Sequence, residues 1–204
     1  PVSCKDKFAT LTDLSKTPTV MSGGRGTIAL SEANLTSEVN STTGDNKEVI
    51  GNISVRSGKW YYEATFEPGG TAGNAGNSDA AGWVCDHGFG YNGTTAGGFC
   101  ILARDNGSTV IGNASSRHDD AQNTFERFNT GDVLGCAIDL ETRVASYYLN
   151  GNLYEFSHNF SGRSDLDDQD FSPFILNRTQ PGTVRVNFGQ NPTFSGAFTT
   201  AGTY

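Results

Sequence analysis

The sequence predicts an all-β fold, an antiparallel two-sheet sandwich with long glycine-rich loops. Residues 57–67 alternate strictly between apolar and polar side chains, a pattern typical of a half-buried β-strand. Residues 182–189 repeat this pattern, so we expect the two strands to pair across a long sequence separation. The 26 glycines, the single methionine and the abundant Ser, Thr and Asn favour short strands and turns over helices.

We expect one domain over residues 1–204, because sandwiches of this length often do not divide. Residues 1–56 mix short apolar pieces with turn-forming residues, and we interpret them as edge strands and coil that wrap the sandwich. Residues 57–189 form the predicted core of the domain, and residues 190–204 form a C-terminal tail.

Strands and loops alternate through the first half of this core. Residues 67–80 lack periodicity and form the first predicted loop, after which residues 81–85 re-enter the interior. The second loop, residues 86–98, is followed by a strand that ends at a tight turn predicted by Asn106-Gly107. Residues 113–130 form the third predicted loop.

Two consecutive turns organise the second half. Residues 131–140 and 143–149 form a predicted hairpin, and Asn150-Gly151 makes the next turn, because this pair tolerates positive φ angles. An acidic loop at residues 164–170 then precedes a strand at residues 171–176.

The apolar positions of these strands define the predicted interior. Aromatic side chains at period-two positions pack in cores far more often than they contact ligands. The four cysteines lack C-x-x-C spacing, so we interpret them as small buried thiols rather than disulfides or zinc ligands. The predicted core residues are Trp60, Tyr62, Phe66, Trp83, Leu134, Ile138, Tyr147, Leu149, Val184, Val186 and Phe188.

Charge and hydropathy exclude two classes of partner. The net charge is −8 with only 18% charged residues, so the surface is mainly uncharged and polar, and nucleic-acid binding is disfavoured. No apolar run reaches the roughly 20 residues needed to span a bilayer, so we expect no membrane insertion.

The motifs give catalysis little support. The histidines lie in predicted loops without a Gly-x-Ser-x-Gly motif, and no Ser-His-carboxylate triad is evident. Glycoside hydrolysis would use Glu63 and Glu67, which alternate onto the face opposite the predicted core. The aspartates of residues 164–170 lack EF-hand spacing and are interpreted as a solvated loop rather than a calcium site. We therefore expect a non-enzymatic protein without cofactor or metal.

A series of motifs occurs in a fixed order along the chain. It begins with Ser57-Gly58-Lys59-Trp60-Tyr61-Tyr62-Glu63 and continues with residues 82–84, 131–140, 145–151, 171–174 and 184–189. This order resembles a SPRY domain, which implies a bent sandwich similar to the jelly roll of concanavalin-like lectins. Residues 8–15 and 187–196 resemble, more narrowly, the SPRY-containing structural proteins of bacteriophages. Chains of that kind usually continue further, so this one is expected to be a fragment, a processed product or a compact variant.

The resemblance implies a recognition or assembly module that binds its partners through loops at one edge of the sandwich. Aromatic and arginine side chains anchor interfaces, so the three predicted loops supply the expected contacts. These expected contacts are Asp86, His87, Tyr91, Asn92, Arg117, His118 and Phe125.

By the same resemblance, the expected protein is a fibre, tail or capsid-surface domain of a bacteriophage virion. Its expected partners are other virion proteins or host-surface glycans and proteins, and it is expected to form homo-oligomers. One alternative is a cytoplasmic adaptor that grips a short peptide of a partner protein. A second alternative is a concanavalin-like lectin or carbohydrate-active enzyme.

Overall fold

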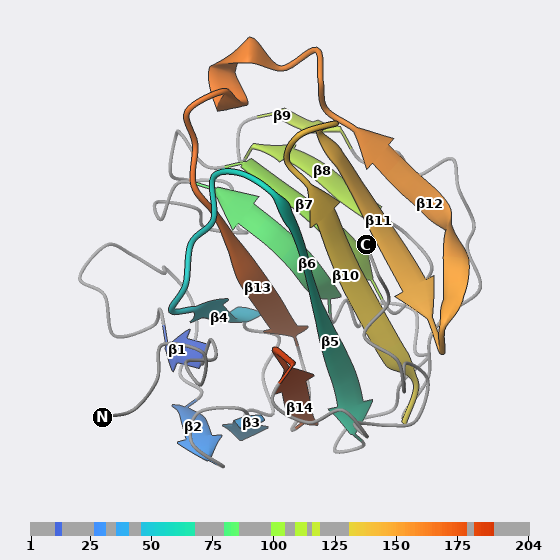
Figure 1. The fold of residues 1–204 in the computed structure, drawn as a ribbon. Helices are drawn as coiled ribbons and strands as arrows, with labels where there is room; N and C mark the ends of the chain where they lie inside the picture. The colour runs from blue at the N-terminus through green and yellow to red at the C-terminus, as the bar shows by residue number, and fades with distance from the viewer. Residues whose placement is uncertain are drawn as a thin grey trace, which may run out of the picture.

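The computed structural model is a β-sandwich of two antiparallel sheets that lie face to face (Figure 1). Each sheet contains seven strands within the described part of the chain. The structure describes residues 11–13, 27–31, 36–40, 46–67, 80–85, 99–104, 109–113, 116–118, 131–178 and 182–189.

The strand order places segments from both ends of the chain in each sheet. The first sheet has the order β1 (Leu11–Asp13), β4 (Asn46–Gly51), β13 (Phe171–Arg178), β6 (Ala80–Cys85), β7 (Phe99–Arg104), β8 (Thr109–Asn113) and β9 (Ser116–His118). The second has the order β12 (Asn152–Asn159), β11 (Val144–Leu149), β10 (Val133–Asp139), β5 (Lys59–Glu67), β14 (Gly182–Asn187), β3 (Thr36–Asn40) and β2 (Thr27–Ser31). A short 3-10 helix, η3 (Ser164–Leu166), interrupts the loop before β13.

The predicted long-range pairing and hairpins are confirmed. Strand β14 lies beside β5, with Val184 opposite Phe66, so the two alternating segments share one sheet. The hairpin of β10 and β11 is also present. Asn150 and Gly151 turn the chain into β12 with φ angles of 50° and 86°, which explains the Asn-Gly pair.

The N-terminal segment supplies strands to both sheets. Strands β1 and β2 lie at the sheet edges, whereas β4 lies between β1 and β13, and β3 lies between β14 and β2. Strands β3 and β9 were not predicted as strands. The segment of β3 reads Thr-Ser-Glu-Val-Asn, which contains one apolar residue, so its alternation is too weak to indicate a strand.

The core fills the space between the two sheets and centres on Tyr62. Its ring meets Trp83 edge to face at 5.3 Å between centroids. Its hydroxyl lies 2.7 Å from the carbonyl oxygen of Gly82 and accepts a hydrogen bond of 2.9 Å from the amide of the same residue. Gly82 belongs to β6 and Tyr62 to β5, so this hydroxyl connects the two sheets in the interior.

The predicted core residues other than Trp60 are either fully or partly buried. Leu149 and Phe188 are only partly buried and pack against the core cluster. Cys85 and Cys136 are buried free thiols, as expected. Those that are buried as predicted are Tyr62, Phe66, Trp83, Leu134, Ile138, Tyr147, Val184 and Val186.

Trp60 does not belong to the core, and the prediction that it does is wrong. It lies on the same side of β5 as Tyr62, but its side chain is 46% exposed. The reason is its position at the second residue of the strand, directly after a bend in which Arg56 and Ser57 are exposed. Alternation assigns a face, whereas burial also depends on how far along the strand a residue lies. Among the described residues, no helix is long and apolar enough to cross a membrane.

Candidate functional site

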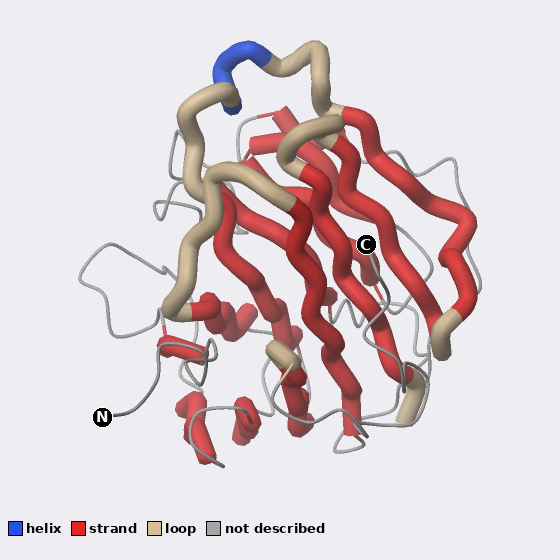
Figure 2. The backbone as a smooth tube through the Cα atoms, viewed as in Figure 1, coloured by secondary structure: helices blue, strands red, loops and turns tan. Residues whose placement is uncertain are grey.

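Three loops gather at the end of the sandwich where β5 and β13 begin (Figure 2). They are residues 52–58, 140–143 and 160–170, and we call them, together with Lys59, Trp60 and Asp139, the rim. Backbone bonds connect them to the sheets: the amide of Leu140 donates to Gly58 at 3.0 Å, and Val55 and Phe171 exchange two bonds of 2.8 Å. The rim is therefore a continuous surface built on ordered strands.

The indole of Trp60 is exposed but held in one orientation. Its Nε1–H donates to the carbonyl oxygen of Ser57 at 2.7 Å. Gly58 has a φ of 82°, and a Cβ added there would lie 3.5 Å from Nε1 of Trp60. An exposed aromatic ring that has already lost rotamer freedom is a favourable anchor for a partner, because less entropy is lost on binding.

Two ion pairs involve residues close to Trp60 in the sequence. Arg56 Nε lies 2.8 Å from Asp170 Oδ1, and Lys59 Nζ lies 3.1 Å from Asp139 Oδ2. The hydrogen bond from Arg56 to Asp170 is the main cause of the raised pKa of Arg56.

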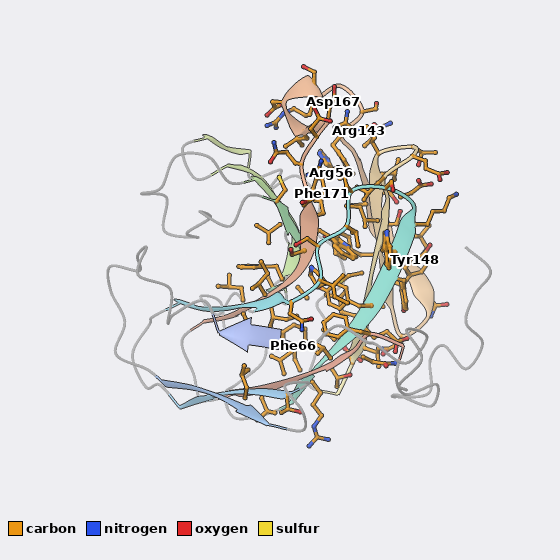
Figure 3. All side chains as sticks on the ribbon, turned by 60° about the vertical axis from the view of Figure 1, so that its left-hand side comes forward. Arg56, Phe66, Arg143, Tyr148, Asp167 and Phe171 are labelled. Carbon is orange, nitrogen blue, oxygen red and sulfur yellow. The ribbon has the colours of Figure 1, made fainter. Side chains whose placement is uncertain are left out.

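A second group of ion pairs lies farther out, around η3. Arg163 donates two hydrogen bonds, of 2.8 and 2.7 Å, to the carboxylate of Asp165. This bidentate hydrogen bonding lowers the pKa of Asp165. Figure 3 shows Arg56, Arg143 and Asp167 at this end of the molecule, with Phe66 toward the other.

Arg143 connects the turn after β10 to the loop that contains η3. Its guanidinium pairs with Asp167, donates to the carbonyl oxygen of Arg163 at 3.0 Å and lies 5.5 Å from the ring centroid of Phe160. Its backbone has a φ of 60°, a left-handed conformation that is unfavourable for a side chain with a Cβ. Such conformations persist where the surroundings fix them and are enriched at functional sites.

Asp139 fixes the turn between β10 and β11. Its Oδ1 accepts the amides of Glu141 and Thr142 at 2.9 and 3.0 Å. These amide bonds, with Thr142 first, and the contact with Lys59 lower the pKa of Asp139 to about 2. The carboxylate is therefore charged at neutral pH and holds the turn next to Trp60 in one conformation.

The opposite pKa shift occurs on the outer face of the second sheet. Glu63 is 3% exposed, and its carboxylate accepts hydrogen bonds from Asn187 Nδ2 at 3.0 Å and from the Tyr61 hydroxyl at 3.1 Å. Burial is the main cause of its raised pKa, and the two hydrogen bonds oppose it. Gly135 lies opposite Glu63 on β10, and a Cβ there would be 2.4 Å from the Tyr61 hydroxyl, so only glycine accommodates this ring.

The sequence suggested two kinds of chemistry for the acidic residues, glycoside hydrolysis and calcium binding, and the structure shows their surroundings. Glu63 lies on the face of β5 opposite Tyr62, as the alternation predicts, and is buried against an amide and a phenol; the side chain of Glu67 is not among those described. The loop of residues 164–170 is not simply solvated, because three of its four aspartates pair with arginines. Within the described residues, no group of three or more His, Cys, Asp and Glu side chains is arranged to hold a metal ion.

The residues expected to contact partners remain predictions. Asp86, His87, Tyr91, Asn92 and Phe125 lie outside the described residues. Arg117 and His118 lie in β9, so this part of the third predicted loop is a strand, and their side chains are not described.

Sequence reasoning did not identify the rim. The sequence indicates the acidic loop, but the arginines that pair with it are residues 56, 143 and 163, which are far apart in the sequence. Trp60 was assigned to the interior because of its period-two position. A signal was nevertheless present, since Ser57-Gly58 immediately before the strand indicates that Trp60 lies beside a turn.

Comparison with known proteins identifies the fold. A family model described as SPRY domain matches residues 59–191. The SPRY domain of human HERC1 superposes with a TM-score of 0.58 at 16% identity, covering 80% of this chain and 94% of that one. The TRIM65 PSpry domain gives 0.54 at 13%, covering 89% and 90%, and a human SPRY domain gives 0.53 at 14%, covering 80% and 96%. A search of curated proteins gave no match.

Proposed function

This chain belongs to the SPRY domain family, and from that premise we propose that it is a protein-binding module that holds a segment of a partner protein at the rim. SPRY domains are in general non-catalytic modules that bind protein partners. This proposal corresponds to the adaptor alternative considered from the sequence, and it assigns binding to the rim rather than to the predicted loops.

One observation carries the proposal: Trp60 is exposed and oriented by its bond to Ser57, and the preceding residues Arg56 and Lys59 form ion pairs. Aromatic and arginine side chains dominate the energetics of protein interfaces, and charged pairs at the edge of an aromatic anchor supply specificity. The rim is also attached to the first sheet, because the ring of Phe160, at the start of a rim loop, packs against the ring of Phe171 at 5.6 Å between centroids.

Selection from a library of short random peptides tests this role with the chain as bait. The wild type is compared with Trp60→Ser and with Leu153→Ser as a matched control. Leu153 is 60% exposed and is the other large exposed hydrophobic residue among those described. It lies on β12, away from the rim loops.

We expect peptides that bind the wild type and the Leu153 variant equally. Their affinity for the Trp60 variant should be about thirtyfold lower, which corresponds to the roughly 2 kcal/mol of an interface hot spot. Peptides that bind all three chains equally would show that the rim is not the binding surface. Circular dichroism of each variant checks that the sandwich is folded.

The virion role expected from the resemblance remains a second hypothesis. The resemblance of residues 8–15 and 187–196 to phage structural proteins and the mainly uncharged polar composition favour it. Oligomer formation and glycan binding belong to the same hypothesis. Sedimentation of the purified chain tests it, because a structural subunit should form a defined oligomer, whereas a monomer at all concentrations argues against assembly through this part of the chain.

A further inference from the structure

The charges of the rim do not balance. Its basic residues are Arg56, Lys59, Arg143 and Arg163, and each of these four forms an ion pair with one aspartate. The rim contains six acidic residues, so two carboxylates are left over. These are Glu141 and Asp168, which are exposed and have no ion-pair partner within the described residues.

Both surplus carboxylates belong to the loops next to Trp60. Glu141 follows Leu140, whose amide bonds to Gly58, and a Cβ on Gly58 would lie 3.5 Å from the indole Nε1. Asp168 lies two residues before Asp170, whose carboxylate is 2.8 Å from Arg56 Nε. With four basic and six acidic side chains, the rim carries a net charge of −2.

Resting on the proposed function, we propose that the rim binds a cationic side chain, an arginine or a lysine of the partner segment, against the face of Trp60. The face of an indole ring attracts cations, and tryptophan is the best aromatic residue for this interaction. Glu141 and Asp168 then supply the countercharges. The surface thus combines an aromatic face with two uncommitted carboxylates, which is complementary to a basic segment.

An acidic segment fits this surface poorly. Every basic side chain of the rim already has an aspartate partner, so an anion would have to break an existing ion pair and also approach Glu141 and Asp168. Like-charge contacts of this kind disfavour the wrong partner. A purely apolar segment would cover the ring but would leave both surplus carboxylates without a partner.

The test uses the indole N–H signal of Trp60 in the NMR spectrum of the full chain. The chain has two tryptophans, and the buried Trp83 serves as an internal reference. The probes are three capped tripeptides, Gly-Arg-Gly, the same peptide with citrulline in place of arginine, and Gly-Glu-Gly. Citrulline keeps the shape of arginine but has no charge. The double variant Glu141→Gln, Asp168→Asn is titrated in parallel.

The arginine peptide should shift the Trp60 signal and leave the Trp83 signal unchanged. The citrulline peptide should bind about two- to fivefold more weakly, and the glutamate peptide more weakly still. The double variant should bind the arginine peptide more weakly than the wild type does, because the countercharges are removed while the Trp60 face remains. Equal affinity for arginine and citrulline would overturn the inference.

Replacing the cationic side chains of the peptides with neutral analogues also separates this inference from the proposed function. Peptides obtained by selection are resynthesised with citrulline at each arginine and norleucine at each lysine. Peptides that depend on Trp60 and lose affinity on this change support both proposals. If they depend on Trp60 but tolerate the change, binding at the rim stands and the cationic preference is wrong. If binding does not depend on Trp60, both proposals fail.

Discussion

The two tryptophans of this chain both lie in β-strands, at different places along them and in opposite surroundings. Trp83 lies at the centre of β6, is 2% exposed, and its buried Nε1–H has no hydrogen-bond partner in the described structure. Trp60 lies at the start of β5, is 46% exposed, and its Nε1–H has a carbonyl partner. In the core, the ring of Trp83 is buried although its Nε1–H has no partner. At the rim, the Nε1–H of Trp60 has a partner although its ring is exposed.

This difference indicates what each region is built for. An unsatisfied buried N–H costs about 1–3 kcal/mol, and only the packing of a large ring offsets it, so Trp83 contributes to stability. The exposed ring of Trp60 contributes less to folding and leaves apolar surface available for a partner. The predictions below test whether the two regions can be separated in this way.

The largest expected effect is that of Trp83→Ala. Removing a fully packed ring between the sheets leaves a cavity, and we expect a loss of about 3–5 kcal/mol in the free energy of unfolding. Urea denaturation measures it. Trp83→Phe is the control, because it keeps an aromatic ring and removes an N–H that has no partner, so it should cost clearly less. Equal losses for the two variants would contradict the packing argument.

Tyr62→Phe should have the next largest effect. The variant keeps the ring but removes the hydroxyl, which leaves the buried amide of Gly82 without its 2.9 Å partner. We expect a loss of about 1–3 kcal/mol in urea denaturation. Tyr61→Phe removes the same atom from a half-buried ring and should cost about 0.5–1.5 kcal/mol. If Tyr62→Phe were no more destabilising than this control, the hydroxyl would not be important in connecting the sheets.

Trp60→Ala should cost about 1–2 kcal/mol, well below Trp83→Ala. Half of the ring is already in solvent, and its removal leaves an open surface rather than a cavity, so the cavity contribution is absent. Thermal unfolding measures the loss, and peptide binding is measured on the same sample. A loss as large as that of Trp83→Ala would show that Trp60 is a core residue, as the sequence pattern suggested.

The sandwich could be predicted from the sequence because its main signals are local: the alternation of apolar and polar residues within strands and the residue types of the turns. Alternation over residues 57–67 and 182–189 fixed which faces of β5 and β14 point inward, and these strands do pair. The Asn150-Gly151 turn was predictable because its positive φ angles require those residue types. Strand β3 was missed because its five residues contain a single apolar side chain.

The rim could not be predicted, because it depends on distances between residues far apart in the sequence. Arg56 and Asp170 are separated by 114 positions, and no periodic pattern relates them. The hydrogen bond between Asn187 and Glu63 could not be predicted for a similar reason, since the two residues are 124 positions apart in the sequence. Alternation identifies the face that a side chain occupies but not what else lies on that face.

The smallest expected effect concerns the turn of the rim and depends on pH. The pKa of Asp139 is about 2 in the folded chain and 3.8 as a free side chain, so this carboxylate stabilises the fold above pH 3.8. That contribution is lost as the pH falls from 3.8 through 2. Asp139→Ala should therefore be less stable than the wild type by about 1 kcal/mol at pH 6, a modest value because the group is near the surface.

The difference between the wild type and Asp139→Ala should narrow as the pH falls through this window, because protonation removes the charge that the variant lacks. Asp139→Asn separates charge from turn geometry, since its amide oxygen still accepts the bonds from Glu141 and Thr142. Urea denaturation at a series of pH values measures all three chains. A difference that stays constant from pH 6 to pH 2 would show that the carboxylate's charge does not hold the turn. The turn would then be held by the hydrogen bonds that the Asp139 side chain accepts and not by its charge.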